Sequence, residues 1–410
     1  MTEAIAPPRL RAAVGFVLAT ITLDILAMSI VIPVLPRLVL GFTGNNPVLA
    51  AHAQTVFGTA WALMQFFFAP VLGALSDRFG RRPVILLSNL GLGLDYLVMA
   101  LAPNLSWLFV GRVISGITAA SFSSANAYIA DITPPEQRAA RFGLISIAFG
   151  FGFVAGPALG GILGQVDPRL PFWVAGGLSL ANFLYGLLVL PESLAPDHRT
   201  PFDAKRANPL GALWLLSNSK ALAPLGGIYF LYALAHSALP NIVVLYVTVR
   251  FSWSIRSVGL MMAAIGVSSA LVGGVLTGPV VKRLGERSAL MIGLGFGVLA
   301  LTAMGFAASG GAFLAAMIAL ALWGFIGPAL GSLMSAAAGP KAQGRLGGAN
   351  GCLMGIAALI GPSLYNESFA VFMRPHHGIS LPGMPFLISA ALLLTAMLLA
   401  LTQRRKREGF

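Results

Sequence analysis

The chain has 410 residues, of which 57% are hydrophobic and only 10% are charged, and its formal net charge is +13. Soluble globular proteins carry about 25% charged residues, so this composition excludes a soluble domain and indicates a polytopic membrane protein. The basic residues lie at the ends of apolar runs and not in one patch with interleaved aromatic residues, so no nucleic-acid partner is expected. The single cysteine, Cys352, excludes a disulfide framework and a cysteine zinc site.

Long apolar runs follow one another along the chain, and a helix of roughly 20 such residues crosses the hydrocarbon core. Residues 41–53 are uncharged and polar, which suits an external loop. The longest polar stretch, residues 191–219, predicts a linker between an N-terminal half (1–190) and a C-terminal half (220–410). We therefore predict an all-α fold of twelve spans in two six-helix halves, at about 12–35, 55–75, 84–102, 172–190, 221–249, 257–281, 289–309, 311–338, 346–369 and 382–401, with a fourth span ending at Asp131 and a fifth around Gly152.

The placement of charge predicts the orientation in the membrane. If both termini are cytoplasmic, 20 of the 26 lysines and arginines fall on the cytoplasmic side, and Arg112 lies within a span. Cytoplasmic loops carry an excess of basic residues in membrane proteins. We therefore expect both ends and the linker in the cytoplasm of a cell with a bacterial-type inner membrane. Five basic residues remain for the opposite side: Arg37, Arg169, Arg250, Arg256 and Arg374.

A charged segment, Gly73 to Pro83, separates the second and third apolar runs and predicts a short loop at the membrane surface. It holds four charged residues within six positions, and its glycines allow tight turns. The same spacing returns 205 residues later from Gly278, with Lys282 in place of Asp77. Gly361-Pro362 likewise follows Gly156-Pro157 by 205 residues, which is half of the chain. Two equivalent halves with a ligand site between them near the midplane are expected.

Three charged residues fall well inside predicted spans: Asp24 in the first, Asp95 in the third and Arg112 in the fourth. An ionisable group is costly in hydrocarbon, so each is a functional candidate. A carboxylate that alternates between a dry, protonated state and a wetter, arginine-paired state can load a proton on one side of a membrane and release it on the other. We therefore expect Asp24 and Asp95 to carry protons and Arg112 to tune them.

These motifs together resemble the major facilitator superfamily, and within it the twelve-helix drug:proton antiporters that include the tetracycline-resistance efflux pumps. The resemblance extends over nearly the whole chain. Its densest parts are Gly73 to Pro83, Leu94-Asp95-Tyr96, Gly111-Arg112, Tyr128 to Asp131 and Gly152 to Gly161.

The resemblance also implies roles for individual residues. Asp24, Asp95 and Arg112 fall on positions that serve proton coupling or the pathway. The glycine-proline string of the fifth span, whose small residues four apart permit close helix approach and whose proline bends the backbone, matches a motif associated with exporters. Its residues are Gly152, Gly156, Pro157, Gly160 and Gly161. A cytoplasmic charge latch is implied at Gly73, Asp77, Arg78, Gly80, Arg81 and Asp131.

The sequence departs from the tetracycline pumps at three positions. In those pumps the eighth and ninth spans carry a histidine and an aspartate that support tetracycline transport, and an ungapped alignment places Ser269 and Gly297 there in this chain. A glutamine of the seventh span is replaced by Ala238. We therefore expect the fold of the family but poor transport of tetracycline itself.

We expect a proton-coupled antiporter that exports an amphiphilic small molecule or drug by alternating access. It should not be an enzyme and should need no cofactor or metal, because nothing resembles a nucleotide loop, a metal-ligand cluster or a nucleophile triad. The expected partners are the substrate, protons and the lipid bilayer, with the chain acting as a monomer. A lipid-like substrate exporter, an uptake symporter on the same fold, and a non-transporting sensor or membrane enzyme are the alternatives. The expected cavity residues are Gln65, Asn89, Asn126, His236, Asn241, Tyr232 and Trp323.

Overall fold

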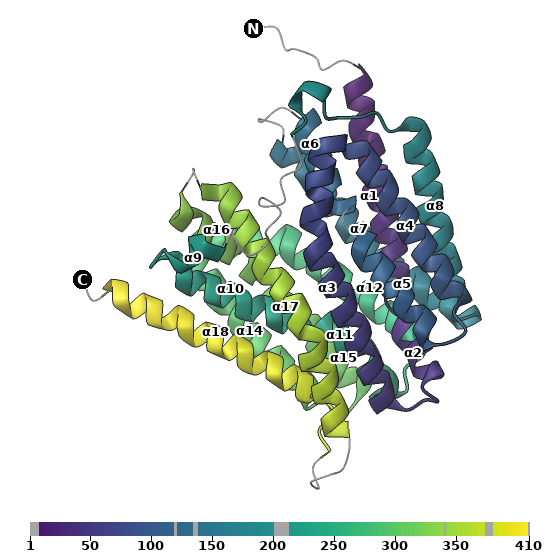
Figure 1. Ribbon diagram of the computed structural model, residues 1–410. Helices are drawn as coiled ribbons and strands as arrows, with labels where there is room; N and C mark the ends of the chain where they lie inside the picture. The colour runs from purple at the N-terminus through teal and green to yellow at the C-terminus, as the bar shows by residue number, and fades with distance from the viewer. Residues whose placement is uncertain are drawn as a thin grey trace. The chain divides into compact units, whose positions relative to one another are not determined.

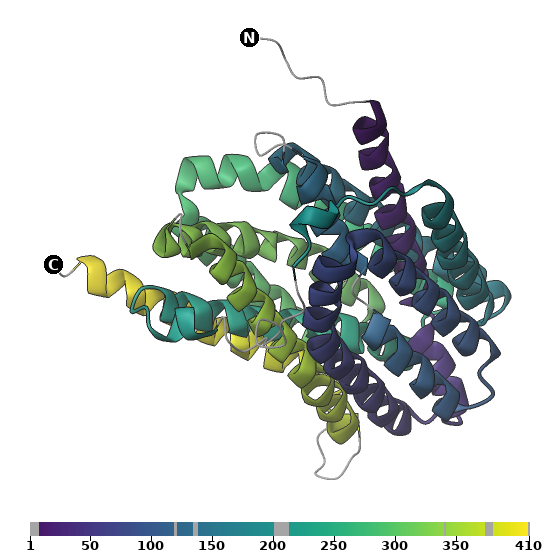
Figure 2. The same cartoon turned by 45° about the horizontal axis from the view of Figure 1, so that its top comes forward.

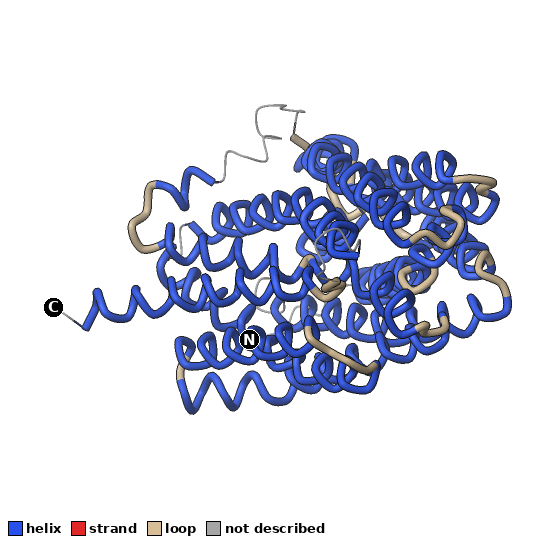
Figure 3. Tube along the Cα trace, turned by 90° about the horizontal axis from the view of Figure 1, so that it is seen from below, coloured by secondary structure: helices blue, strands red, loops and turns tan. Residues whose placement is uncertain are grey.

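The computed structural model describes residues 8–118, 121–133, 138–200, 213–339, 342–373 and 380–408. In this part of the chain helices are the only regular structure, as Figure 3 shows. Eleven helical segments are long and apolar enough to cross a membrane, and Leu105–Thr118 is a shorter apolar helix. That helix and Ser121–Ile132 occupy the predicted fourth span. The all-α, twelve-span prediction is therefore confirmed.

The chain divides into two compact units, which Figures 1 and 2 show in two views. Unit 1 comprises residues 1–35 and 60–208, and unit 2 comprises residues 36–59 and 209–410. The division after residue 208 falls inside the predicted linker. The domain boundaries at 190 and 220 stay a prediction.

Each unit is built from long helices joined by short connections. The helices of unit 1 are α1 (Pro8–Val31), α3 (Pro47–Phe79, whose first turns belong to unit 2), α4 (Arg81–Leu101), α5 (Leu105–Thr118), α6 (Ser121–Ile132), α7 (Arg138–Val166) and α8 (Leu170–Val189). Those of unit 2 are α2 (Leu35–Phe42, starting at the unit boundary), α9 (Trp214–Ser217), α10 (Leu222–His236), α11 (Ala238–Phe251), α12 (Ile255–Leu271), α13 (Thr277–Leu284), α14 (Glu286–Gly305), α15 (Gly310–Ala319), α16 (Ile326–Ala338), α17 (Gln343–Met373) and α18 (Met384–Glu408).

Two predicted loops are shorter in the structure than expected. The segment from Gly73 continues α3 as helix to Phe79, and α4 begins at Arg81, so Gly80 alone connects them. Gly80 has φ of 107°, a conformation that glycine adopts without steric cost. The predicted loop at 41–53 is also mostly helical, because α3 already begins at Pro47. Charge and polarity therefore did not indicate where these helices end.

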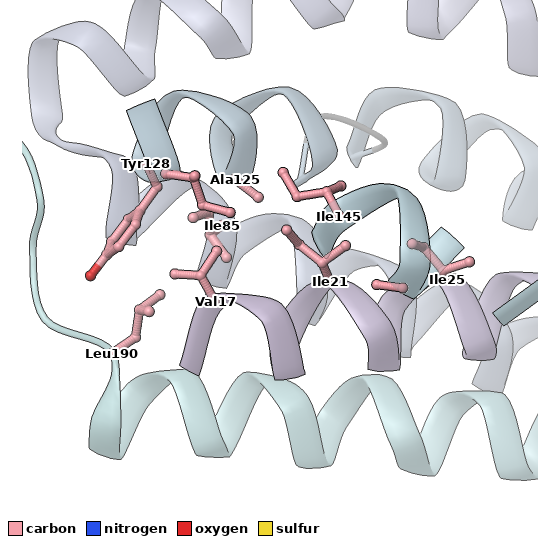
Figure 4. Close-up of a cluster of buried hydrophobic side chains, with 10 residues drawn as sticks. Val17, Ile21, Ile25, Ile85, Ala125, Tyr128, Ile145 and Leu190 are labelled. Carbon is pink, nitrogen blue, oxygen red and sulfur yellow. The ribbon is translucent and has the colours of Figure 1, made fainter. Parts of the chain in front are cut away.

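The core of unit 1 is an apolar cluster shown in Figure 4. Val17, Ile21 and Ile25 come from one face of α1, at the four-residue spacing that aligns side chains along a helix. They meet side chains of α4, α6 and α7 and Leu190, which follows α8. α1 is thus the central helix of unit 1. The other members of the cluster are Ile85, Ala125, Tyr128, Ile129, Ile145 and Ala148.

The packing of α1 on α7 depends on glycine. A methyl group at Gly156 would overlap the side chain of Ser29, and one at Gly160 would overlap the backbone carbonyl of Ile30. The Ser29 hydroxyl donates a hydrogen bond to the Gly152 carbonyl oxygen at 2.8 Å. Small residues four apart let two helices approach closely in lipid, where no hydrophobic force drives them together. The four-residue spacing of these glycines therefore allows α1 to approach α7 closely, as the sequence predicted.

A matching contact occurs in unit 2, between α17 and the junction of α10 with α11. A methyl group at Gly361 would lie 2.5 Å from the hydroxyl oxygen of Ser237. Gly361 follows Gly156 by 205 residues, and Ser237 follows Ser29 by 208. A serine thus lies against the repeated glycine in each unit, although the two serines are three residues out of register with the repeat.

We predict that Gly160→Ala destabilises the protein by about 1–3 kcal/mol, because its methyl group meets backbone that has no rotamer to change. Gly150→Ala on the same helix is the matched control, since nothing lies within 4 Å of its added methyl group. Thermal unfolding of the two variants in the same detergent measures the difference. Equal melting temperatures would show that α1 can move away from α7 at no cost.

Candidate functional site

The first buried charge pair joins α4 to α5. Asp95 is fully buried, and its Oδ2 lies 3.2 Å from Nη2 of Arg112. Gly111 makes room for this pair, because a methyl group there would lie 2.6 Å from Oδ1 of Asp95. The same Nη2 lies 3.3 Å from Sδ of Met99. Two of the three ionisable residues predicted for proton coupling are therefore in direct contact.

Asp24 lies in a second polar group, surrounded by amides. Nδ2 of Asn182 donates to Oδ1 of Asp24 at 2.8 Å and lies 3.0 Å from the carbonyl oxygen of Thr20. Asn89 is fully buried, and in the amide orientation that satisfies its neighbours it donates to both Asp24 oxygens at 3.0 Å. Asn89, predicted to line a substrate cavity, instead lies against the carboxylate. α1, α4 and α8 all contribute to this group.

The charged end of unit 1 is an arginine-carboxylate network around Arg81. Its Nη1 is bonded to Asp77, and its Nε donates to Oδ2 of Asp131 at 3.0 Å. Glu192 accepts from the backbone nitrogens of Arg81 and Arg82, at 2.8 and 3.3 Å. A carboxylate at these positions satisfies unpaired N–H groups at the start of α4 and faces the positive end of the helix dipole.

Three of the predicted latch residues therefore meet as expected. Arg78 does not join them: it is exposed, and its guanidinium lies 5.0 Å from the ring centre of Phe79. Gly80 is the connection between α3 and α4, and Gly73 lies within α3 with open space beside it.

The corresponding connection of unit 2 has the same backbone and different side chains. Gly285 joins α13 to α14 with φ of 80° and ψ of 162°, close to the 107° and 161° of Gly80. Lys282 and Arg283 are exposed there, and neither forms a salt bridge within residues 213–339 or the rest of the described chain. Among the described residues, the segment from Gly73 forms salt bridges and the segment from Gly278 does not. This agrees with the expected electrostatic difference between the two segments.

Three predicted cavity residues form an aromatic cluster in unit 2. The ring of His236 is stacked on Trp323, with centroids 5.0 Å apart and an interplanar angle of 17°. Tyr232 meets both rings edge to face, at 6.0 and 5.9 Å. Trp323 lies in a 3₁₀ segment, Leu320–Phe325, between α15 and α16, and a 3₁₀ stretch within a helix often marks a hinge or a strained sequence. Within this cluster the side chain of Trp323 is buried, and His236 has the most exposed ring.

The other predicted residues are not part of this cluster. Asn241 donates to the carbonyl oxygen of Ser237 and packs beside Gly361. Gln65 is half-buried on α3 in unit 1. The side chain of Asn126 lies outside the described residues. Pro157 lies inside α7, and Gly161 is buried on the same helix.

Sequence reasoning missed two polar residues that complete these groups, and a third that forms a separate group in unit 2. Asn182 binds Asp24, and Glu192 binds the start of α4. Glu367 of α17 accepts from Thr55 at 2.7 Å and lies 2.7 Å from Nδ1 of His52, all within unit 2. For Asn182 a signal was present, because an amide is rare in so apolar a run. For the other two nothing in the sequence indicated the partner.

Twelve apolar spans that hold an ion pair and a partnered carboxylate inside them define a polytopic membrane transporter. The sequence profile of the Major Facilitator Superfamily matches residues 17–362 and again 225–409. The chain belongs to the Major Facilitator Superfamily.

Among proteins of known name, the chain is similar to tetracycline resistance protein class C of Escherichia coli, with 37% identity over 93% of this chain and 94% of that one. It is 34% identical to tetracycline resistance protein class D of Salmonella ordonez, over 90% and 91% of the two chains. Among solved structures, the human organic anion transporter MFSD10 (TETRAN) matches with a TM-score of 0.69 and 25% identity, over 96% of this chain and 100% of that one. The family resemblance expected from the motifs is therefore confirmed.

We predict that Asp77→Asn impairs transport more than Lys282→Gln does. Asp77 is bonded to Arg81, and a partly exposed pair of this kind is worth on the order of 1 kcal/mol, or roughly a five-fold change in a conformational equilibrium. Lys282 occupies the matching position with no such partner in the described chain. Initial transport rates at equal expression measure the effect. If both variants transport as the wild type does, the two segments act only as topology signals.

Proposed function

We propose that the protein is a proton-coupled antiporter that exports an amphiphilic small molecule by alternating access. The observation that carries the proposal is the contact between Asp95 and Arg112 inside membrane-spanning helices. The long alignment with proteins named for tetracycline resistance supports drug export as the direction of transport. No separate observation favours an uptake symporter or an enzyme.

In this proposal Asp24 and Asp95 are the proton carriers. Arg112 pairs with Asp95 when that carboxylate is ionised, and protonation of Asp95 releases the pair. Asn182 and Asn89 hold Asp24 by donating to its oxygens, so they act as positioning residues. Proton binding thereby changes which contacts hold α4 to α5 and α1 to α8, and a change of contacts is what shifts a conformational equilibrium.

The aromatic cluster is the proposed contact for the exported molecule. Stacked and edge-to-face rings offer an apolar surface for a planar or aromatic group, and the histidine adds one polar edge. A ligand of this kind has to be amphiphilic, because it enters from water or from the bilayer interface. The chemistry of Tyr232, His236 and Trp323 supports this proposed substrate class.

We further propose that the chain acts as a monomer in the inner membrane of a bacterium, with both termini in the cytoplasm. The distribution of basic residues supports this orientation. Reporter fusions at Lys205 and at Asn46 should report opposite sides of the membrane. The same side for both would contradict the span count between them.

A susceptibility panel of amphiphilic antibiotics and dyes in a pump-deleted bacterium identifies a substrate, which is then used in proteoliposomes. We predict that the double variant Asp24→Asn/Asp95→Asn loses proton-driven accumulation but keeps downhill exchange of that substrate. Asparagine preserves the shape of aspartate and removes titration. The double variant is compared with Asn182→Asp. This substitution leaves both proposed proton carriers in place and puts a second carboxylate beside Asp24. Wild-type proton coupling in the double variant would exclude these carriers.

We predict that expression of the protein gives little or no tetracycline resistance. The positions of the histidine and aspartate used by the resembling pumps are Ser269, which is exposed, and Gly297, which is buried. A first side-chain carbon at Gly297 would lie 2.6 Å from Leu393 and 3.6 Å from Cβ of Trp323, so no larger residue fits without repacking. Inhibitory concentrations are compared with those of cells that express the class C protein. Comparable resistance would show that neither titratable residue is needed.

A further inference from the structure

A pocket of about 900 Å³ lies within unit 2, where α10 and α14 begin and α16 and α18 end. Its rim is polar and exposed, with Lys220 before α10 and Arg287 and Ser288 at the start of α14. Its inner wall is apolar and buried: Ile228 is 1% exposed and Leu290 is 3% exposed. The pocket therefore combines a charged rim with an apolar wall, which complements an amphiphilic ligand. Its volume is at the upper end of the roughly 300–1,000 Å³ range of ligand pockets.

The rim is suited to an anion. Neither Lys220 nor Arg287 forms a salt bridge within the described chain, and no acidic residue lines the pocket. The neighbouring acid, Glu286, accepts a hydrogen bond from the Ser332 hydroxyl at 2.5 Å. The first turns of α10 and α14 also open at this rim, and helix N-termini attract negative charge.

The apolar wall continues out of the pocket. Leu401 of α18 lines the pocket and is 39% exposed, and Leu398, one turn earlier on the same helix, is also exposed. Leu401 and Leu398 therefore offer an apolar chain two exposed contacts along α18 beside the pocket. A small soluble anion would not contact the apolar side chains of the inner wall. A purely apolar ligand would leave Lys220 and Arg287 without a negatively charged partner.

We propose that this pocket binds one anionic phospholipid, with its phosphate between Lys220 and Arg287 and an acyl chain along Leu225, Ile228 and Leu290. Basic pockets between membrane helices hold anionic headgroups in this way. The bound lipid contacts α10, α14, α16 and α18 together, so it stabilises unit 2. The site is separate from the aromatic cluster, and the proposal does not depend on which molecule is transported.

The test uses the purified full chain in a neutral detergent, with phosphatidylglycerol as the probe and zwitterionic phosphatidylcholine, whose net charge is zero, as the comparison. We expect phosphatidylglycerol to raise the melting temperature and to appear as a bound lipid in native mass spectrometry. In Lys220→Gln/Arg287→Gln the affinity should fall roughly 30-fold, since each basic residue near an anionic headgroup contributes about five-fold. Ala336→Trp, at the exposed mouth of the pocket, should block binding while both charges stay in place.

The matched control is Lys282→Gln/Arg283→Gln, which removes two exposed basic residues of the same unit that do not line the pocket. Retained binding in this control, with loss in the pocket variant, supports the site. An equal loss of phosphatidylglycerol binding in the two double variants would mean that the lipid is attracted by surface charge in general, and it would overturn the proposed site. So would equal stabilisation by phosphatidylcholine, or by inorganic phosphate alone. If Ala336→Trp does not fold, the two charge variants decide the question.

Discussion

A charge inside an apolar helix bundle is stable only when another part of the same chain supplies its partner, because hydrocarbon supplies none. This constraint determines how unit 1 is assembled. Asp95 holds α4 to α5 through Arg112, and Asp24 holds α1 to α4 and α8 through two amides. The groups that we propose for proton coupling are therefore also contacts between helices. Any step that changes their protonation must change how those helices pack, which is the coupling that an antiporter requires.

Much of the fold could be predicted from the sequence because lipid leaves few choices. Long apolar runs must be helices. The offset of 205 residues indicated two related halves, but it did not predict that Gly156 and Gly361 would each lie against a serine. The ends of the helices were predicted poorly. The segment from Gly73 is charged and so reads as a loop, yet it remains helical to Phe79 because its charges can point into water from the end of a long helix.

The site was predicted in part, for a similar reason. Asp24, Asp95 and Arg112 were found because ionisable residues stand out in an apolar run. Their uncharged partners do not stand out: Asn182 binds Asp24 from 158 positions away. The latch residues carry charge, but the carboxylate at the start of α4, Glu192, comes from beyond the sixth span. Composition and spacing locate a buried charge, whereas its hydrogen-bond partners depend on tertiary packing.

The single-residue connections at Gly80 and Gly285 have a mechanical consequence. Two helices that share one connecting residue can change the angle between them, but neither can slide along the other by even one turn, because no slack remains in the chain. α3 with α4, and α13 with α14, therefore behave as hinged pairs of fixed register. When the far end of one helix in such a pair is displaced, the angle between the two helices changes. The glycine between them is the hinge residue.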